Sequence, residues 1–341
     1  MGYNIGGFLR KFTRARPSIV VNYLVCMNKI RRAIITAAGR GTREYPATAS
    51  VQKELFPIVD RDGFTRPVLQ IIVEEALTSG IENICIITNP TNDGPIRSHF
   101  QPLSKEALHT QFAGKEWAER ESNRLAEMRD RITFVQQRTQ DGFGHAVLQA
   151  KSWAGDEPFA VTVGDHVYTS CERGVPCLRQ VLDVAERDEQ CAAVSSVWRA
   201  PEIDVPRYGT VRGRRVIPGT SSPLVIEQMV EKPSIAYARE HLKTDGLPVG
   251  EHLCFFGIHA FPTEMFLCLE EVVRNNIRVR GEFQLTSAQE LLLNHGVYYA
   301  CEVFGRSFDM GVPEGYLKTQ LAIALESVFA ESVRELFVAR T

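Results

Sequence analysis

The sequence predicts an α/β fold in which a mixed, mostly parallel sheet is flanked by helices. The first half of the chain alternates short apolar, β-branched runs with amphipathic segments, as in residues 31–38, 66–80 and 82–90. This strand–helix–strand order predicts parallel pairing through a right-handed crossover. After Pro201 the apolar runs are separated by turn glycines and prolines, which predicts a small antiparallel portion.

Each element in the first half has its own pattern. Residues 31–38 are a buried-strand run stopped by a glycine, and residues 82–90 are a second such run. Residues 66–80 place apolar side chains at helical spacing between Pro67 and Gly80. By the same criteria we expect helices over 103–131 and 144–154, strands over 132–137 and 191–200, and one strand over 159–168 that carries Gly164 and Asp165 at its end.

The second half predicts strands over 207–216, 223–233, 252–261 and 297–305, helices over 263–275 and 283–296, and a mostly helical tail from Pro313. We therefore expect one α/β domain at residues 30–311 and a C-terminal helical segment at residues 312–341. Residues 1–29 are basic before a short apolar run, and we expect a flexible leader there. The alternative is that Met27 is the true start of the chain.

Composition limits the classes of function. The chain has 341 residues and a formal net charge of −2, so no bulk positive field favours a nucleic-acid partner. No apolar run reaches the roughly 18 to 20 residues that a bilayer-spanning helix needs, so we expect no membrane partner. Eight cysteines occur without a CxxC pair, and several lie in apolar runs. We expect free, buried thiols, which suit a reducing cytoplasm.

The loop after the first strand carries two glycines, Gly39 and Gly41, and two cations, Arg43 and Lys53. Loops at the carboxyl ends of strands bind ligands in open α/β sheets, and glycines let backbone N–H groups approach a phosphate. The GxGxxG dinucleotide pattern fails at Glu44, and no Gly-Lys pair completes a P-loop. Two cations in this loop favour a site that neutralises a triphosphate. The alternative is a tight turn with two surface cations.

Several motifs, taken in order, resemble one family. "GRGTR" followed by "KELFP" resembles the signature of the sugar-1-phosphate nucleotidylyltransferases, and "QQRTQDGFGHAV" resembles their nucleotide-base loop. "VGDHVY", "VEKP", "GEFQLT" and "FDMGVPEGYLK" resemble their metal and sugar segments. The GxGHAV form and the helical insertion between Asn92 and Arg131 are most like the bacterial UTP–glucose-1-phosphate uridylyltransferases. The resemblance covers roughly residues 30 to 325 and implies a Rossmann-like, nucleotide-diphospho-sugar transferase fold.

The resemblance also implies a role for each matching residue. The loop from Ala37 to Thr42 would contact the nucleotide through its backbone, and its members are Ala37, Ala38, Gly39, Gly41 and Thr42. Arg43 would hold the β- and γ-phosphates, while Lys53 would bridge the nucleotide and sugar phosphates. The remaining implied residues are Gln137 and Gly142 at the uracil, Asp165 and Asp309 at Mg²⁺, Glu231 and Gly209 at the sugar, and Lys232 at a phosphate.

The chain departs from the family pattern at five positions. Ala49 stands where a lysine is usual and Gln52 where a proline is usual. The other departures are Gln136 for an arginine, Ser287 for an aspartate, and His166 for a valine or asparagine. Because these positions flank the implied nucleotide and sugar contacts, the choice of nucleotide and of sugar stays open.

The implied reaction is attack of a glucose 1-phosphate oxygen on the α-phosphorus of UTP, giving UDP-glucose and pyrophosphate. Both reactants are anions, so Mg²⁺ and positioned cations are needed, whereas a general base is not. Two alternatives remain: another pair such as dTTP with a different sugar 1-phosphate, or a non-catalytic relative that binds a sugar nucleotide. The family also implies a homo-oligomer acting on small molecules.

Overall fold

The computed structural model describes residues 27, 29–217 and 223–338. The expected leader at residues 1–29 therefore lies outside the described residues, apart from positions 27 and 29. Met27 is buried and packs in the same apolar cluster as Ile30. In the described part of the chain, no helix combines the length and the apolar character that crossing a membrane requires.

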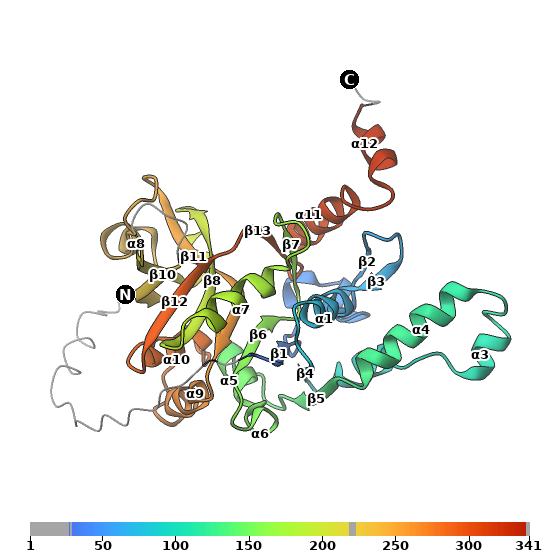
Figure 1. The fold of residues 1–341 in the computed structure, drawn as a ribbon, viewed down its shortest axis with the longest axis horizontal. Coiled ribbons are helices and arrows are strands. Elements are labelled where there is room, and N and C mark those ends of the chain that lie inside the picture. The colour runs from blue at the N-terminus through green and yellow to red at the C-terminus, as the bar shows by residue number, and fades with distance from the viewer. Residues whose placement is uncertain (1–26, 28, 218–222, 339–341) are drawn as a thin grey trace.

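Nine of the described strands form one twisted central sheet (Figure 1). From one edge to the other the order is β5 (Ile132–Gln136), β4 (Asn83–Thr88), β1 (Arg32–Thr36), β6 (Phe159–Val163), β11 (Glu251–Phe261), β8 (Cys191–Pro201), β12 (Val297–Glu302), β10 (Leu224–Val230) and β9 (Thr210–Arg215). The first four strands run parallel, as does the pair β8–β12, while β11, β10 and β9 pair antiparallel with their neighbours. The predicted α/β class with a mixed sheet is confirmed.

Alternating side chains of the central strands face two apolar layers. On β1, Ala33 and Ile35 join one core cluster, whereas Ile34 joins the other. This follows from the two-residue period of a strand, and it explains why the run is apolar at every position. Helices α1 (Val68–Thr78) and α7 (Cys177–Arg187) contribute to the first cluster, and α5 (Phe143–Leu148), α9 (Glu264–Arg274) and α10 (Leu285–Leu292) contribute to the second.

Smaller elements lie around the central sheet and the helices packed on its two faces. The expected helix over 103–131 is two helices, α3 (Lys105–His109) and α4 (Glu116–Arg129), which project from the body in Figure 1. The C-terminal α11 (Pro313–Ala324) and α12 (Ala330–Val338) extend from another side. The other helical elements are α2 (Asp93–His99), α6 (Lys151–Ala154), α8 (Ile235–His241) and the 3₁₀ turns η2 (Thr42–Glu44), η3 (Ala47–Ala49), η4 (Lys53–Leu55) and η5 (Val205–Arg207).

Two short two-stranded sheets lie beside the central one. β2 (Pro57–Val59) pairs with β3 (Thr65–Pro67), and β7 (His166–Ser170) pairs with β13 (Gly305–Asp309). The first pair follows directly after Lys53 in the chain. It is anchored by Arg66, whose side chain is 2% exposed and donates to Asp60, Asp62 and Glu121 at 2.6–3.2 Å. This network ties the segment after the glycine loop to helix α4.

The antiparallel strands expected after Pro201 are present and belong to the mixed central sheet. Two other expectations need correction. The single strand expected over 159–168 is two strands, β6 and β7, because the chain turns at Gly164 and Asp165 and β7 pairs with β13 instead. Of the seven described cysteines, all unpaired, Cys171 is exposed and not buried; Cys26 lies outside the described residues. Cys171 sits beyond the end of β7, in a surface loop.

Candidate active site

The loop after β1 is held in place through its carbonyl groups. Asn92 Nδ2 donates to the Ala37 oxygen at 2.6 Å, and Asn89 Nδ2 donates to the Ala38 oxygen at 3.1 Å. Gln140 Nε2 also donates to the Ala38 oxygen, at 2.9 Å. Both asparagines are buried at the end of β4, so the second parallel strand fixes the loop that follows the first. The site lies at the carboxyl edge of the parallel strands, where ligands of such sheets bind.

Gly41 is needed for the shape of this loop. Its φ is 64°, which glycine adopts without strain, and a Cβ there would lie 2.8 Å from the Thr48 methyl. At Gly39 a Cβ would lie 3.3 Å from Lys53 Cε. The lysine side chain therefore runs directly over the glycine loop, which explains the spacing of the two motifs in the sequence.

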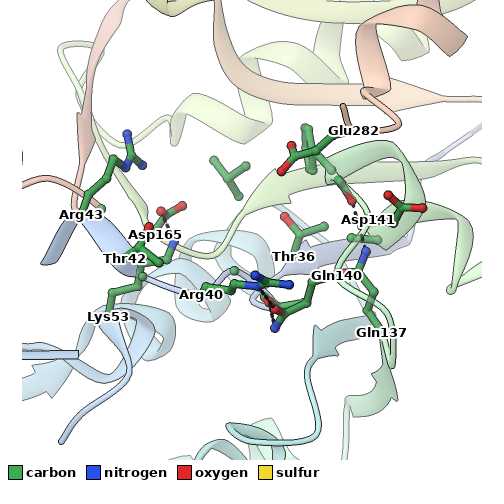
Figure 2. A pocket seen from close by; sticks show the side chains of 18 of the residues that line it. Thr36, Arg40, Thr42, Arg43, Lys53, Gln137, Gln140, Asp141, Asp165 and Glu282 are labelled. Carbon is green, nitrogen blue, oxygen red and sulfur yellow. Dashed lines mark hydrogen bonds and ion pairs between the residues drawn. The ribbon is translucent and has the colours of Figure 1, made fainter. Parts of the chain in front are cut away.

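A cleft of about 640 Å³ opens beside the loop. Figure 2 shows Arg43, Lys53 and Asp165 at one end of it and Gln137 and Asp141 at the other. Three groups of expected site residues line it: the nucleotide-binding residues Ala38, Gly39, Gly41, Thr42, Gln137 and Gly142, the catalytic cations Arg43 and Lys53, and the metal ligand Asp165. Ala37 is fully buried beneath the loop and does not line the cleft.

Lys53 lies between two carboxylates. Its side chain is 11% exposed, its Nζ donates to Asp165 Oδ2, and Glu54 Oε1 lies 3.3 Å away. Burial opposes the charge on Lys53, but the neighbouring carboxylates outweigh it and raise the pKa of the ammonium. Burial likewise opposes ionisation of Asp165, and the charge of Lys53 outweighs it, so that the pKa of Asp165 falls to about 2. Lys53 and Asp165 are thus a charged pair throughout the physiological range.

The second acid, Asp309, meets Asp165 beside Gly311. A Cβ on Gly311 would lie 2.7 Å from Asp165 Oδ2, 3.0 Å from Asp309 Oδ1 and 2.9 Å from an Nη atom of Arg43. Arg43 Nη1 lies 3.5 Å from Asp309 Oδ2. Asp309 ends β13 and Asp165 precedes β7, and the pairing of these two strands brings the acids together. The structure therefore gathers both expected metal ligands and both expected catalytic cations at one place.

The other end of the cleft is a small polar pocket. Gln137 is 3% exposed, and its Nε2 lies 3.1 Å from the Gly142 oxygen and 3.0 Å from His145 Nδ1. Gly142 has a φ of 108°, and a Cβ there would lie 2.6 Å from the Phe283 oxygen. Glycine at this position lets the 276–284 loop close against the pocket. Arg278 fastens that loop by a two-nitrogen pair with Asp141 at 2.5 and 2.8 Å.

A second cavity of about 210 Å³ lies on the other side of Asp309. Its walls are mostly aromatic, with polar groups near Asp309; the lining residues are His166, Trp198, Tyr208, Phe255, Phe256, Gly305, Arg306, Ser307 and Asp309. His166 Nδ1 lies 3.2 Å from Ser307 Oγ, a contact between the paired strands β7 and β13 at the wall of this cavity.

Gly209, Glu231 and Lys232, the residues expected at the sugar and its phosphate, line neither cavity, but Gly209 adjoins Phe255, which forms part of the wall of the second one. A Cβ on Gly209 would lie 2.6 Å from the Phe255 ring and 3.1 Å from Glu231 Oε2. Glu231 accepts a hydrogen bond from Thr286 at 2.6 Å, and Lys232 Nζ lies 3.3 Å from its other oxygen. Neither Glu231 nor Lys232 lines the larger cleft. Lys232 has a φ of 47°, a backbone conformation that is strained for lysine and is common at functional sites.

The sequence profile of the nucleotidyl transferase family matches residues 32–326. The chain belongs to that family. A curated relative, the UTP–glucose-1-phosphate uridylyltransferase of Bacillus subtilis (strain 168), is 33% identical over 305 residues, which cover 88% of this chain and 93% of the relative.

Solved structures agree with this assignment. A UTP-bound UGPase from Acinetobacter baumannii superposes with a TM-score of 0.71 at 28% identity, covering 91% of this chain and 99% of that one. A UDP-glucose pyrophosphorylase complexed with UDP-glucose superposes with a TM-score of 0.68 at 26% identity, covering 86% of this chain and 98% of that one. The fold is therefore that of a nucleotidyl transferase.

Several residues of this nucleotidyl transferase site were not identified from the sequence. Glu54 is buried beside Lys53, Gly311 leaves room between the acids, and Phe255 forms the wall shared by Gly209 and the second cavity. Thr286 donates to Glu231 from the first turn of α10. Gly311 carried a signal, because it lies in the segment that resembles the family's second metal motif. Glu54 stands in the quoted "KELFP" motif, but the motif gave it no role, and Phe255 carried no signal because it lies in an apolar run.

The donors of this nucleotidyl transferase suit a metal shared with a substrate. Within the described residues, no three histidine, cysteine, aspartate or glutamate side chains form a cluster that would hold an ion alone. Asp165 and Asp309, however, direct carboxylate oxygens at one point beside Gly311. Mg²⁺ is commonly bound by one or two carboxylates, with phosphate oxygens and waters completing an octahedron. The pair of acids fits that mode of binding.

Proposed function

We propose that this protein transfers the uridylyl group of UTP to glucose 1-phosphate, releasing pyrophosphate and UDP-glucose, in a Mg²⁺-dependent reaction. One observation carries the proposal: Arg43, Lys53, Asp165 and Asp309 meet at the boundary between a long nucleotide-sized cleft and a smaller aromatic cavity. The names of the relatives and structural neighbours support this choice of substrates, and the presence of two cavities supports separate binding places for them.

The nucleotide occupies the 640 Å³ cleft. Gln137 hydrogen bonds the uracil edge at the closed end, where Gly142 allows the 276–284 loop to approach. The backbone N–H groups of residues 38–42 contact the ribose and phosphates. The loop is held for this by Asn92 and Asn89, which donate to the carbonyl oxygens of Ala37 and Ala38. The triphosphate then extends toward Arg43 and Lys53 at the open end.

The sugar 1-phosphate occupies the second cavity. Glu231 accepts hydrogen bonds from sugar hydroxyls, with Thr286 holding its carboxylate in place. The aromatic walls, Phe255 among them, pack on the sugar ring, and Gly209 lets the ring approach closely. Lys232 contacts the phosphate, which lies toward Asp309.

Bond making and breaking occur at the α-phosphorus. An oxygen of the sugar phosphate attacks in line, the bond from this phosphorus to the bridging oxygen of pyrophosphate breaks, and pyrophosphate leaves with the electron pair. No proton has to be removed, since the attacking oxygen is already anionic. Asp165 and Asp309 would hold Mg²⁺, which supplies charge neutralisation for both phosphates.

Arg43 and Lys53 exchange partners in this scheme. Without substrate they pair with Asp309 and Asp165, so the acids keep both cations directed at the boundary of the two cavities. With substrates bound, the cations turn to phosphate oxygens, while Asp165 and Asp309 would hold the metal. The cations thus stabilise charge at the position where it develops on the leaving pyrophosphate.

The deciding experiment is pyrophosphate release with a panel of nucleoside triphosphates and sugar 1-phosphates, with and without Mg²⁺. We expect the fastest turnover with UTP and glucose 1-phosphate, and none when the metal is chelated. Preference for dTTP or another sugar would keep the enzyme but change its substrates. No release with any pair, together with tight binding of UDP-glucose, would identify a non-catalytic relative and contradict the proposal.

We also infer that the protein acts in the cytoplasm, where its unpaired described cysteines would stay reduced, and that it is a homo-oligomer. The support for the oligomer is an exposed apolar stripe at helical spacing, formed by Leu317, Leu321 and Leu325 along and just beyond α11. Light scattering on the purified chain tests the oligomer, and replacing Leu317 and Leu321 by glutamate should lower the mass of the particle. If light scattering gave the unmodified protein the mass of a single chain, this inference would be contradicted.

A further inference from the structure

Glu54 is a buried carboxylate for which the reaction scheme above has no use. Its side chain is 1% exposed, although it neighbours Lys53 in the chain. Neither carboxylate oxygen makes a hydrogen bond to any part of the chain that the structure describes. The cation near it is Lys53, whose Nζ lies 3.3 Å from Glu54 Oε1.

An acidic side chain is a costly choice at such a position. Removing a carboxylate from water is unfavourable unless hydrogen bonds or a charge partner compensate, and within the described residues the charge partner of Glu54 is the ammonium of Lys53. Burial raises the pKa of Glu54 to about 7 despite that ammonium. An apolar residue of similar volume would fill the same space without this cost. The acid therefore does something for Lys53 that packing alone does not.

The geometry indicates what Glu54 does for Lys53. Lys53 is held by three contacts: its Cε approaches Gly39, and its ammonium lies between Asp165 and Glu54. In the proposed reaction Asp165 becomes a metal ligand, so its contact with Lys53 is weakened. Glu54 cannot follow, because it is the middle residue of the 3₁₀ turn η4 and its side chain is enclosed in the protein. It is the partner that remains when substrates bind.

We propose that Glu54 is a positioning residue, which holds the Lys53 ammonium at the boundary of the two cavities after Asp165 has turned to the metal. The inference rests on the proposed function, since it concerns the step in which both phosphates are present. It separates two tasks: Asp165 orients Lys53 in the free enzyme, and Glu54 orients it in the complex with substrates.

The test compares Glu54→Gln in two backgrounds, the unmodified enzyme and a Lys53→Met variant. In the unmodified enzyme we expect kcat to fall roughly tenfold with little change in KM for UTP, because orientation matters most in the reacting complex. In the Lys53→Met background the same change should alter kcat by less than about twofold, since the ammonium that Glu54 acts upon is gone.

A matched control is Glu75→Gln. Glu75 resembles Glu54 in being buried, and burial raises its pKa to about 7 as well. Unlike Glu54, it accepts a backbone hydrogen bond from the Leu178 N–H at the start of α7. This control should keep the kcat of the unmodified enzyme per folded molecule. A second variant, Glu54→Met, should lower kcat without lowering the melting temperature, which a purely structural role would not do.

The outcomes separate this inference from the proposed function. Turnover by the unmodified enzyme together with an unchanged kcat in Glu54→Gln would overturn the inference alone. An equal loss in both backgrounds would overturn it too, because Glu54 would then act independently of Lys53. Absence of turnover in the unmodified enzyme would overturn the proposed function, and the inference would fall with it.

Discussion

The carboxylates of Asp165 and Asp309 converge on one point beside Gly311, 2.7 and 3.0 Å from the position that a Cβ on that glycine would take. The two acids come from distant parts of the sequence and meet because β7 and β13 pair as antiparallel neighbours. The absence of a side chain at Gly311 leaves the space between them open. This space is where the proposed metal and both phosphates have to fit.

Gly311→Ala should therefore abolish most of the activity while leaving the fold intact. The new methyl group would crowd Asp165 Oδ2 and lie 2.9 Å from Arg43, whereas the backbone of Gly311 is not in the left-handed region. We expect kcat/KM to fall on the order of 10²-fold, as when one preorganised catalytic contact is lost. Pyrophosphate release measures the effect, and the melting temperature should be nearly unchanged.

A glycine elsewhere provides the control for that substitution. Gly94 lies in helix α2, and a Cβ there would meet no atom within 4 Å, so Gly94→Ala should keep full activity. Full activity in Gly311→Ala as well would contradict the placement of the phosphates between the two acids.

Asp309→Asn should change the dependence of the rate on Mg²⁺. The amide keeps the size of the side chain and one oxygen ligand but loses the negative charge that attracts a hard cation. We expect the Mg²⁺ concentration for half-maximal rate to rise at least about tenfold, with part of the activity recovered at high metal concentration. Titrating Mg²⁺ at saturating UTP measures this.

The half-buried acid Asp183 is a suitable comparison for Asp309. It pairs with Arg179 on α7 and is not among the residues that line the cleft, so Asp183→Asn should leave the Mg²⁺ titration unchanged. If Asp309→Asn lost activity equally at every Mg²⁺ concentration, its carboxylate would be acting on Arg43 and not on a metal.

The sequence was sufficient for the order of elements and for the loop beside them. Apolar runs fixed β1 and β4 within two residues at each end, and the failure of the GxGxxG pattern at Glu44 excluded a dinucleotide loop. The spacing of Gly39 and Lys53 has a physical meaning, because the lysine passes over the glycine. Relations of this kind join residues that are close in the sequence, so a sequence pattern can reveal them.

What the sequence did not predict depends on contacts between distant segments. The turn at Gly164 that separates β6 from β7 exists because β7 pairs with β13, which lies far along the chain. The burial of Glu54 depends on the layers packed around η4, and a glutamate next to a lysine normally indicates a solvated pair. In the sequence nothing distinguishes Phe255 from the other core residues of β11. Its role follows from the close approach of its ring to Gly209.

Phe255→Ala should weaken sugar binding selectively. Its ring would lie 2.6 Å from a Cβ at Gly209 and forms a wall of the 210 Å³ cavity, so its removal enlarges the space beside Glu231. We expect KM for glucose 1-phosphate to rise about tenfold, from lost packing on the sugar, with KM for UTP within twofold. Steady-state kinetics with each substrate varied in turn measures this.

Phe304 offers a phenylalanine control outside both cavities. Its side chain is exposed, and only its backbone takes part in the recorded hydrogen bonds, so Phe304→Ala should keep both KM values. An equal rise of both KM values in Phe255→Ala would mean that the cavity does not belong to the sugar alone.

Glu75 should make the stability of the protein depend on pH in a way that Glu75→Gln removes. Burial raises its pKa to about 7 in the folded state, from 4.5 in an unperturbed carboxyl. Between these values the folded state binds a proton that the unfolded state releases, so the free energy of unfolding falls as pH rises. The loss approaches about 3 kcal/mol by pH 7.5, and the glutamine variant lacks it.

The measurement is the difference in melting temperature between Glu75→Gln and the unmodified protein at each pH. Glutamine keeps an oxygen that accepts the Leu178 N–H, so the two proteins share that hydrogen bond. We expect the variant to gain roughly 5 °C relative to the unmodified protein between pH 4.5 and pH 7.5. Taking the difference cancels the titration of all other groups, which both proteins share. A difference that stays constant across this range would mean that Glu75 is ionised in the folded state at low pH, stabilised by the α7 N-terminus more than burial disfavours it.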